Sequence, residues 1–313
     1  MTATSIHLRE ARHDDYEDVA AFTENTWPDR EGGDYIPRVY HDWIDGDDRR
    51  TVVADAGDDI AGIVQCVMLS EWEAWGQGMR VNPAFRGRGV ANRMTEDLFE
   101  WARGQGATVL RNMVFSWNVA GLGQSRAAGY DPATEFRWAT PEPDPDAVPR
   151  TDADFEIAAD PDAAWRFWTD SPARDHLRGL ALDRDESWAV SQLTREDLRT
   201  AADDDGLFVV QGDGTEGFAH RVREYEREGD ESGESETETW VEYGVGAWTD
   251  AASADAVLAA VARDAADRGA DRTRVLIPET VRAVSDVAAC RVSVSAEPDF
   301  VMAADLTGGR GRT

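Results

Sequence analysis

The sequence predicts an α/β (α+β) protein of two tandem domains, residues 1–140 and 151–313, joined by a linker at 141–150. Strand-like and helix-like patterns alternate along the first 140 residues. A run of prolines and acids, Pro141 to Pro149, then interrupts them, and such a run continues neither a helix nor a central strand. A similar order of elements follows the run, and 313 residues suffice for two domains of about 150 residues each.

The first elements follow from simple periodicities. Residues 5–10 alternate apolar and polar side chains, which indicates a strand with one buried face. Residues 13–27 carry apolar groups at helical spacing, with Asp14 and Asp15 in the first turn, where the helix dipole favours acids. A second short helix is expected at 35–44, and a hairpin turn at Ala56–Asp59 joins strands at 51–54 and 60–69.

A further strand at 75–81 leads through Asn82-Pro83 into a loop of glycine and arginine, and then into a helix. One face of this helix is apolar because side chains recur at spacings of four, four and three: Val90, Met94, Leu98 and Trp101. Gly104 and Gly106 end the helix. The first domain closes with a strand at 108–115, a helix at 119–128 and a strand at 136–139.

The second half repeats this order with weaker signals. A helix is expected at 163–168, followed by strands at 207–210, 217–222 and 240–248. An alanine-rich helix at 252–268, ended by Gly269, precedes strands at 274–277 and 300–304. The acidic stretch 223–239 is expected to be a solvated loop. A Gly-Ala pair follows the long helix of each half, so we infer an internal duplication.

The composition is strongly acidic, with 62 acids, 32 bases and a net charge of −30. Every base is arginine, a usage that resembles the proteins of halophilic archaea, which live in molar salt. The acidity then reflects the solvent, since the Debye length at about 1 M salt is only about 3 Å. Such a surface also disfavours nucleic acid as a partner. The chain is expected to act as a monomer or homodimer.

Cysteine and histidine show no metal-binding pattern, and no metal site is expected. Cys66 lies in an apolar run and is expected to be a buried strand thiol, far in sequence from Cys290. The sequence contains no signal-peptide pattern and no apolar run of membrane-spanning length. We therefore expect a cytoplasmic location and no membrane partner.

The charge of one window departs from the rest of the chain. Residues Met79 to Met94 include four arginines and no acid. The loop within this window is glycine-rich, follows a strand and opens into a helix, whose N-terminus offers free N–H groups and partial positive charge. The window therefore predicts an anion site suited to a diphosphate. It lacks the Gly-Lys-Ser/Thr ending of a P-loop and the full Gly-x-Gly-x-x-Gly of a Rossmann fold.

The stretch from Val81 to Ala91, Val-Asn-Pro-Ala-Phe-Arg-Gly-Arg-Gly-Val-Ala, resembles the Arg/Gln-x-x-Gly-x-Gly/Ala signature of the GNAT acetyltransferases. Asn118 to Tyr130 is similar to the closing segment of that family. The resemblance implies a mixed, mostly antiparallel central sheet flanked by helices, and acetyl-CoA as acyl donor. The family's donor contacts fall here on Met79, Arg80, Val81, Arg86, Gly87, Arg88, Gly89, Val90, Ala91, Asn92 and Asn118.

The resemblance also implies direct attack of an amine on the thioester, helped by proximity and by a backbone oxyanion donor near residues 79–81. Ser125 stands where many family members have a tyrosine that protonates the leaving thiolate, so Ser125, water or Tyr130 is left for that role. Glu71 and Glu73, at the turn before strand 75–81, are the candidate bases, and a solvated turn is the alternative for both.

Residues Asp34, Tyr35 and Trp72 are the candidates for contact with the acceptor. The second half lacks the Arg-Gly loop and carries Asp250 there instead, so we expect a degenerate GNAT-like domain without its own acyl donor. The sequence thus predicts an acetyl-CoA-dependent N-acetyltransferase for a small or amino-acid-like primary amine. A protein N-terminal or lysine acetyltransferase and a non-catalytic acyl-CoA-binding sensor remain the alternatives.

Overall fold

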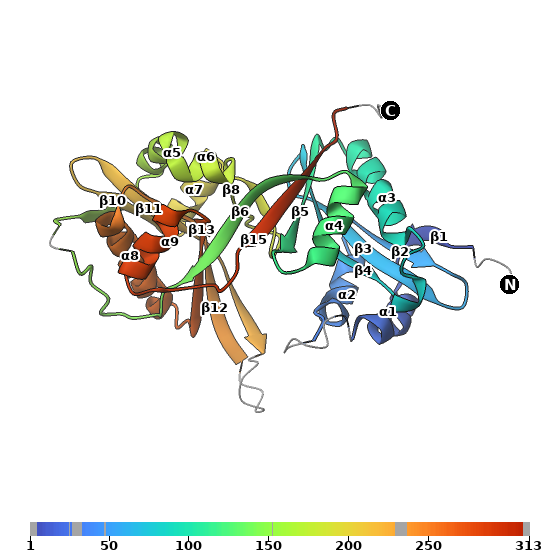
Figure 1. Ribbon diagram of the computed structural model, residues 1–313. Coiled ribbons are helices and arrows are strands. Elements are labelled where there is room, and N and C mark those ends of the chain that lie inside the picture. The colour runs from blue at the N-terminus through green and yellow to red at the C-terminus, as the bar shows by residue number, and fades with distance from the viewer. Residues whose placement is uncertain are drawn as a thin grey trace. The chain divides into compact units, whose positions relative to one another are not determined.

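The computed structural model describes residues 5–24, 26, 33–46, 48–151, 153–228 and 237–308, and the chain divides into two compact units. The first unit contains residues up to 114, 118–132 and the C-terminal segment from 301 onward. The second unit contains 115–117 and 133–300. Both units combine a sheet with flanking helices (Figure 1).

The first unit is built on the strand order β1-β2-β3-β4-β5-β15. Its strands are β1 (His7–Glu10), β2 (Arg49–Asp55), β3 (Ile60–Met68), β4 (Glu73–Val81), β5 (Val109–Phe115) and the end of β15 (Asp299–Asp305). β1 to β4 pair antiparallel, whereas β4 and β5 run parallel. The helices are α1 (Tyr16–Thr23), α2 (Ile36–Ile44), α3 (Val90–Gly104) and α4 (Val119–Ala128), with short 3-10 turns at His13–Asp15 and Pro83–Phe85.

Helix α3 forms because its apolar side chains fall on one face. Val90, Met94 and Leu98 are buried in the core with β2 to β5, as their spacing predicts. Helix α1 is shorter than expected, since its first turn is a 3-10 turn, and residues 25 and 27–32 lie outside the described part. Cys66 is a buried, free thiol in β3, as predicted.

The second unit has the strand order β6-β13-β12-β11-β10-β7, with β14 also paired to β6. These strands are β6 (Asp131–Thr140), β7 (Glu156–Ala158), β10 (Leu207–Gln211), β11 (Thr215–Glu228), β12 (Thr237–Trp248), β13 (Arg272–Pro278) and β14 (Ser293–Val294). β8 (Leu180–Leu182) and β9 (Val190–Gln192) pair separately. The helices are α5 (Pro161–Asp170), α6 (Pro172–Leu177), α7 (Arg195–Asp203), α8 (Ala251–Asp267) and α9 (Val281–Ala289).

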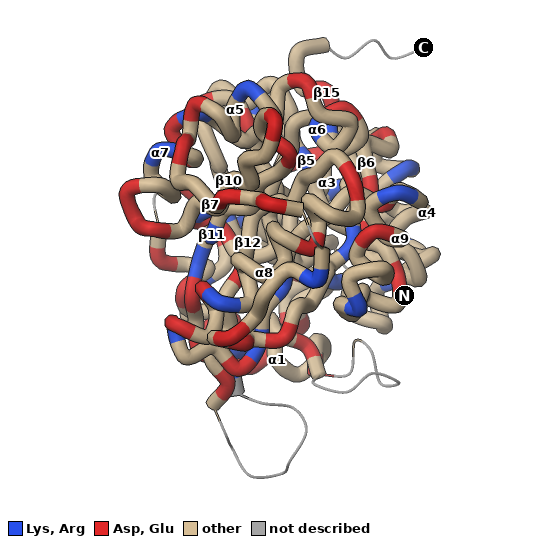
Figure 2. Tube along the Cα trace, turned by 90° about the vertical axis from the view of Figure 1, so that its left-hand side faces the viewer, with Lys and Arg blue, Asp and Glu red and all other residues tan. Residues whose placement is uncertain are grey.

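The mixed, mostly antiparallel architecture predicted from the sequence is confirmed, and several details differ from expectation. The strand expected at 136–139 in the first domain is part of β6, most of which belongs to the second unit. The stretch 223–239 is not a loop throughout: residues 223–228 and 237–242 pair as the ends of β11 and β12. The end of β15 belongs to the first unit, where Met302, Ala304 and Leu306 join the core and the Leu306 N–H donates to the Thr108 carbonyl. Acidic positions recur along the elements of the chain, interspersed with arginines (Figure 2).

Candidate functional site

A bulge and a splayed edge make β4 unlike its neighbours. Ile63 of β3 lies opposite Arg80, but Gln65, two residues on, lies opposite Gln77, so β4 holds one extra residue between these pairs. On its other side, β4 pairs with β5 only from Glu73 to Trp75, where Arg111 is the last partner. Backbone groups of β4 beyond Trp75 therefore face an edge at which β5 no longer pairs, and an extended ligand can add there like a strand.

Gly78 fixes the shape of the bulge. Its φ of 65° lies in the left-handed region, which side chains other than glycine rarely adopt. A Cβ at this position would lie 2.1 Å from the Trp43 ring of α2, too close for any side chain. The bulge therefore depends on glycine both for its backbone conformation and for the close approach of α2.

The loop after β4 opens the N-terminus of α3. Gly87 and Gly89 both have φ of 73°, and a Cβ on either would meet no atom within 4 Å. Gly89 is the N-cap, and among the described residues no side chain caps this helix end. The first N–H groups of α3 lack intrahelical partners, since the Arg93 N–H is the one that donates to Gly89. Residues 86–89 are exposed, so the predicted loop presents open N–H groups and positive charge to solvent.

The four arginines of this window have different surroundings. The Arg88 guanidinium lies 5.1 Å from the centre of the Phe85 ring. Arg93 donates to the carbonyl of Ile6 at 2.8 Å. Arg86 is exposed beside the glycines. The fourth, Arg80, turns away from the loop, so three arginines remain near the helix N-terminus.

Arg80 instead forms a buried ion pair with Asp34, whose side chain is fully buried, with Nε 2.6 Å from Oδ2. Asp34 also accepts the N–H of Ile36 at 3.1 Å and so begins α2. The Arg80 guanidinium lies 5.5 Å from the centre of the Tyr35 ring. Asp34 and Tyr35, expected to contact the acceptor, thus join α2 to the strand that bears the bulge.

Polar side chains gather where β5 leaves β4. The Asn112 Nδ2 donates to Ser125 Oγ of α4 at 3.2 Å, and the Asn112 Oδ1 is buried with no hydrogen-bond partner among the described residues. The buried Tyr130 lies close by, since a Cβ on Gly76 would be 3.3 Å from its hydroxyl. Burial raises the pKa of Tyr130 well above its usual value. Asn118 caps α4 by accepting the Gly121 N–H at 2.9 Å.

The sequence analysis missed Asn112. Its signal is a polar residue among the inward positions of β5, between Leu110 and Val114, both of which are buried in the core. An amide at such a position needs polar partners.

Neither of the predicted bases belongs to the polar cluster of Asn112, Ser125 and Tyr130. Glu73 begins β4 and is buried against Arg111, with an ion pair between their side chains, so it is not a solvated turn residue. It precedes Gly78 by five residues, a separation of about 17 Å along a strand. Glu71 and Trp72 are exposed in the turn before β4, at the same far end.

The corresponding helix of the second unit provides a contrast. A bulge also occurs in β12, where Ala219 lies opposite Gly246 but Arg221 lies opposite Tyr243. Yet α8, the helix that follows β12, begins at Asp250, whose side chain accepts the Ser253 N–H at 2.9 Å. This hydrogen bond holds the pKa of Asp250 below its usual value. The N-terminus of α8 is therefore closed by a carboxylate of the chain itself.

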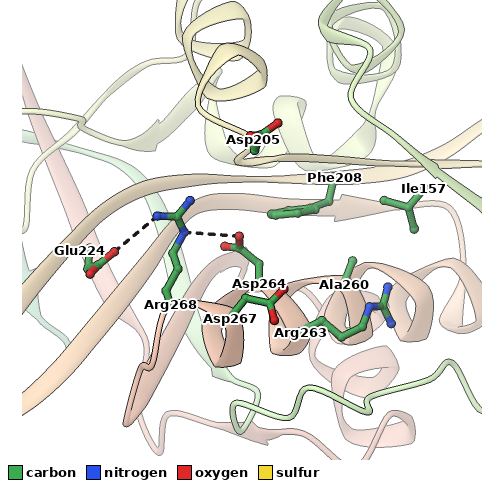
Figure 3. A pocket seen from close by; sticks show the side chains of 9 residues that line it. All are labelled: Ile157, Asp205, Phe208, Glu224, Ala260, Arg263, Asp264, Asp267 and Arg268. Atoms are coloured by element: carbon green, nitrogen blue, oxygen red, sulfur yellow. Dashed lines mark ion pairs between the residues drawn. The ribbon is translucent and has the colours of Figure 1, made fainter.

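A surface hollow of about 600 Å³ also lies in the second unit (Figure 3). Its apolar lining comes from Ile157, Phe208 and Ala260. Its central cation, Arg268, is already paired with Glu224 at 3.6 Å and Asp264 at 3.5 Å. The lining as a whole holds four acids and two arginines, so it suits an anion less well than the loop before α3 does.

Within the described ranges, no cluster of three or more His, Cys, Asp or Glu side chains is arranged to hold a metal ion. No helix there has the length and apolarity needed to cross a membrane.

Comparison with known proteins gives the same assignment as the loop and the splayed sheet. Residues 9–123 match the acetyltransferase (GNAT) family. This match spans 115 of the 313 residues, so it is a similarity of part of the chain to that family. The fold is also that of GNAT proteins: a GCN5-related N-acetyltransferase from Sphaerobacter thermophilus is similar over 97% of each chain, with a TM-score of 0.62 and 14% identity. A structure from Thermoplasma acidophilum covers 96% of this chain and 100% of its own, with a TM-score of 0.56 and 16% identity.

A curated protein that is similar to part of this chain is the histidine N-acetyltransferase of Xenopus tropicalis, which is 41% identical over 61 residues. That match covers 19% of this chain and 19% of the relative, so the chain matches about a fifth of the relative's length.

Proposed function

We propose that the first unit binds acetyl-CoA and transfers its acetyl group to the primary amine of a small or amino-acid-like molecule. The open N-terminus of α3, preceded by Gly87 and Gly89, is the observation that carries this proposal. Its N–H groups and helix dipole suit a diphosphate, and three nearby arginines add positive charge. The GNAT match over residues 9–123 supports the same reading.

The remainder of the donor site follows from the splay of β4 and β5. N–H groups of residues 87–92 would hold the pyrophosphate, and the β4 edge from Gly76 to Val81 would pair with the pantetheine amides, with the Asn118 side chain close to the donor. Acetyl-CoA supplies an activated acyl group as a thioester. An N–H at the bulge, near Met79, would donate to the carbonyl oxygen of that thioester.

The chain contributes mainly by orientation. Holding amine and thioester together is worth about 7–11 kcal/mol when the geometry is productive. For the leaving thiolate, Ser125 and Tyr130 lie at the splay, and Tyr130 stays protonated because burial raises its pKa. Glu73 is left out of this scheme because its buried carboxylate is paired with Arg111, and Glu71 because it lies in the exposed turn before β4. Water is then the acceptor for the proton of the amine.

Two observations support this choice of acceptor. The curated relative acts on histidine, which makes a free amino acid the first class to test. The buried Asp34–Arg80 pair orders the segment around Tyr35 against β4, so this segment would shape the acceptor side. The second unit would be a degenerate GNAT-like domain, since Asp250 closes the helix end at which a diphosphate would bind.

The experiment is a thiol-release assay with acetyl-CoA and a panel of amino acids and simple amines, at about 0.3 M and about 3 M KCl. We expect amine-dependent thiol release and one donor bound per chain. Thiol release that does not depend on the amine would refute the proposal, and so would the absence of acetyl-CoA binding at both salt concentrations.

A second candidate is a non-catalytic acyl-CoA sensor. It is favoured by serine at position 125, where a stronger proton donor is usual in the family. A sensor binds acetyl-CoA but releases no thiol with any amine, so the same assay separates the two functions.

A further inference from the structure

The second unit encloses one arginine in a cage of tryptophans. Val241, Tyr243 and Val275 pack in the core with α8. Because side chains alternate along strands, Glu242 and Arg274 lie on the opposite face of the sheet. Arg274 is 5% exposed there.

Indole rings approach the Arg274 guanidinium from different directions, since the planes of the Trp138 and Trp188 rings are inclined by 82° to each other. The ring centres of Trp138 and Trp188 lie 4.2 Å and 4.0 Å from its Cζ, and that of Trp240 lies 5.9 Å away. Cation–π contact of this kind is worth about 0.5–2 kcal/mol.

One edge of the Arg274 guanidinium already has a hydrogen-bond partner, and the other edge does not among the described residues. Arg274 Nε donates to Glu242 Oε1 at 2.6 Å. Nη2 is buried beside the same carboxylate without a hydrogen bond of good geometry, and no partner of Nη1 is found among the described residues. Glu242 is shared with Arg223, whose Nε lies 2.9 Å from Oε2, and with the Tyr225 hydroxyl at 2.9 Å. Two guanidinium groups thus rely on one carboxylate, which leaves the Nη edge of Arg274 under-neutralised in an otherwise acid-rich chain.

A further acid, Asp299, does not pair with this edge. Asp299 accepts the indole N–H of Trp138 at 3.0 Å, and burial raises its pKa to about 6. No ion pair between Asp299 and Arg274 is found in the described ranges.

Trp188 forms the outer wall and carries two unusual features. It is 37% exposed, and its φ of 65° is in the left-handed region although it is not glycine. That conformation costs about 1–2 kcal/mol, so the surroundings must hold it in place. Part of that support is Arg223, which donates through Nη2 to the carbonyl of Glu186 at 3.2 Å. The Phe115 ring lies 6.4 Å from Trp188 and stacks on Trp117 at 5.3 Å, which extends the aromatic surface.

We propose that this cage is a binding site for a small aromatic carboxylate. The carboxylate would take the Nη edge of Arg274, a geometry that guanidinium groups favour, and the ring would stack on the exposed indole of Trp188. The proposal is independent of acetyl transfer, because it concerns residues of the second unit alone.

The test is a titration of the full chain with benzoate, benzamide and benzylamine, followed by tryptophan fluorescence and calorimetry. Benzoate is expected to bind at least about tenfold more tightly than the other two, and less tightly at about 3 M KCl than at about 0.3 M. Equal affinity for benzoate and benzamide would overturn the proposal.

Variants locate the site. Arg274→Gln should weaken benzoate binding at least about tenfold, and Trp188→Gly at least about fivefold. Trp188→Gly also relieves the backbone strain, so it should fold even where the arginine variant does not. Trp72→Ala is the matched control, since Trp72 has a similar exposure of 41% in the first unit, and it should leave affinity unchanged. The same effect from the Trp72 and Trp188 variants would refute the assignment.

Discussion

Replacing Gly89 by Asp tests the charge of the α3 N-terminus directly, with Gly89→Asn as the matched variant. The two side chains have nearly the same shape, and both tolerate the left-handed φ of 73° better than other residues do. No atom lies within 4 Å of a Cβ built at Gly89, so neither variant meets a steric clash. Any difference between them in donor affinity therefore reports the added negative charge.

The size of that difference follows from Coulomb's law. A unit charge pair at 4 Å is worth about 1 kcal/mol in water and about 4 kcal/mol at an effective dielectric constant of 20. Residues 86–89 are exposed, so the lower value applies, and a diphosphate carries about two charges. We expect Gly89→Asp to bind acetyl-CoA about 2 kcal/mol, or about 30-fold, more weakly than Gly89→Asn at low salt.

The assay is calorimetric titration with acetyl-CoA at about 0.1 M and about 1 M KCl, after thermal unfolding has shown that both variants are folded. Because the Debye length falls to about 3 Å at about 1 M salt, the difference between the variants should shrink there. If the two variants bind within about twofold of each other at low salt, the diphosphate does not lie at this helix end.

Three further predictions concern stability and are measured by chemical denaturation. Gly78→Ala should lower the free energy of unfolding by about 3 kcal/mol, since a Cβ there meets the Trp43 ring and the backbone is left-handed; a loss below about 1 kcal/mol would contradict the bulge geometry. Asp34→Ala should lower it by about 3–5 kcal/mol, because it removes the fully buried carboxylate that pairs with Arg80, and equal stability of Asp34→Ala and wild type would contradict this. Asp299→Asn should raise the free energy of unfolding. Burial raises the folded-state pKa of Asp299 from 3.8 to about 6, so the folded wild type binds the proton more tightly than the unfolded chain does. The free energy of unfolding of the wild type therefore falls by up to about 3 kcal/mol as pH rises from about 4 to about 6. The variant should lack this pH dependence, and parallel pH profiles would contradict the origin of the shift.

The loop before α3 was predictable because its signals are local. Two glycines and several arginines occur together in a chain dominated by acids, directly after a strand and before a periodic helix. Backbone freedom, charge and helix position are all encoded within about ten residues. The register of β4 against its neighbours is known only from the structure. The extra residue of β4 and the early end of its pairing with β5 depend on neighbouring strands, and no local sequence pattern reveals them.

Features that depend on distant pairing were not predictable. Glu73 looks like a turn residue until β5 brings Arg111 beside it. The return of β15 to the first unit depends on a backbone hydrogen bond between Leu306 and Thr108, almost 200 residues apart. The tryptophans around Arg274 are likewise scattered along the sequence, and only the sheet brings them together.

The two long helices of this chain show how one residue decides what a helix N-terminus can bind. Each follows a bulged strand and crosses over to a parallel one, so the backbone N–H groups at its start have the same intrinsic need for acceptors. At α8, Asp250 supplies the acceptor from within the chain, and an incoming phosphate would have to displace a carboxylate and overcome its charge. At α3, Gly89 supplies no side chain, so the N–H groups are left for a ligand. A glycine N-cap is less stabilising than an aspartate N-cap by roughly a few tenths of a kcal/mol, and the chain tolerates that loss at the end where the surrounding arginines favour an anion.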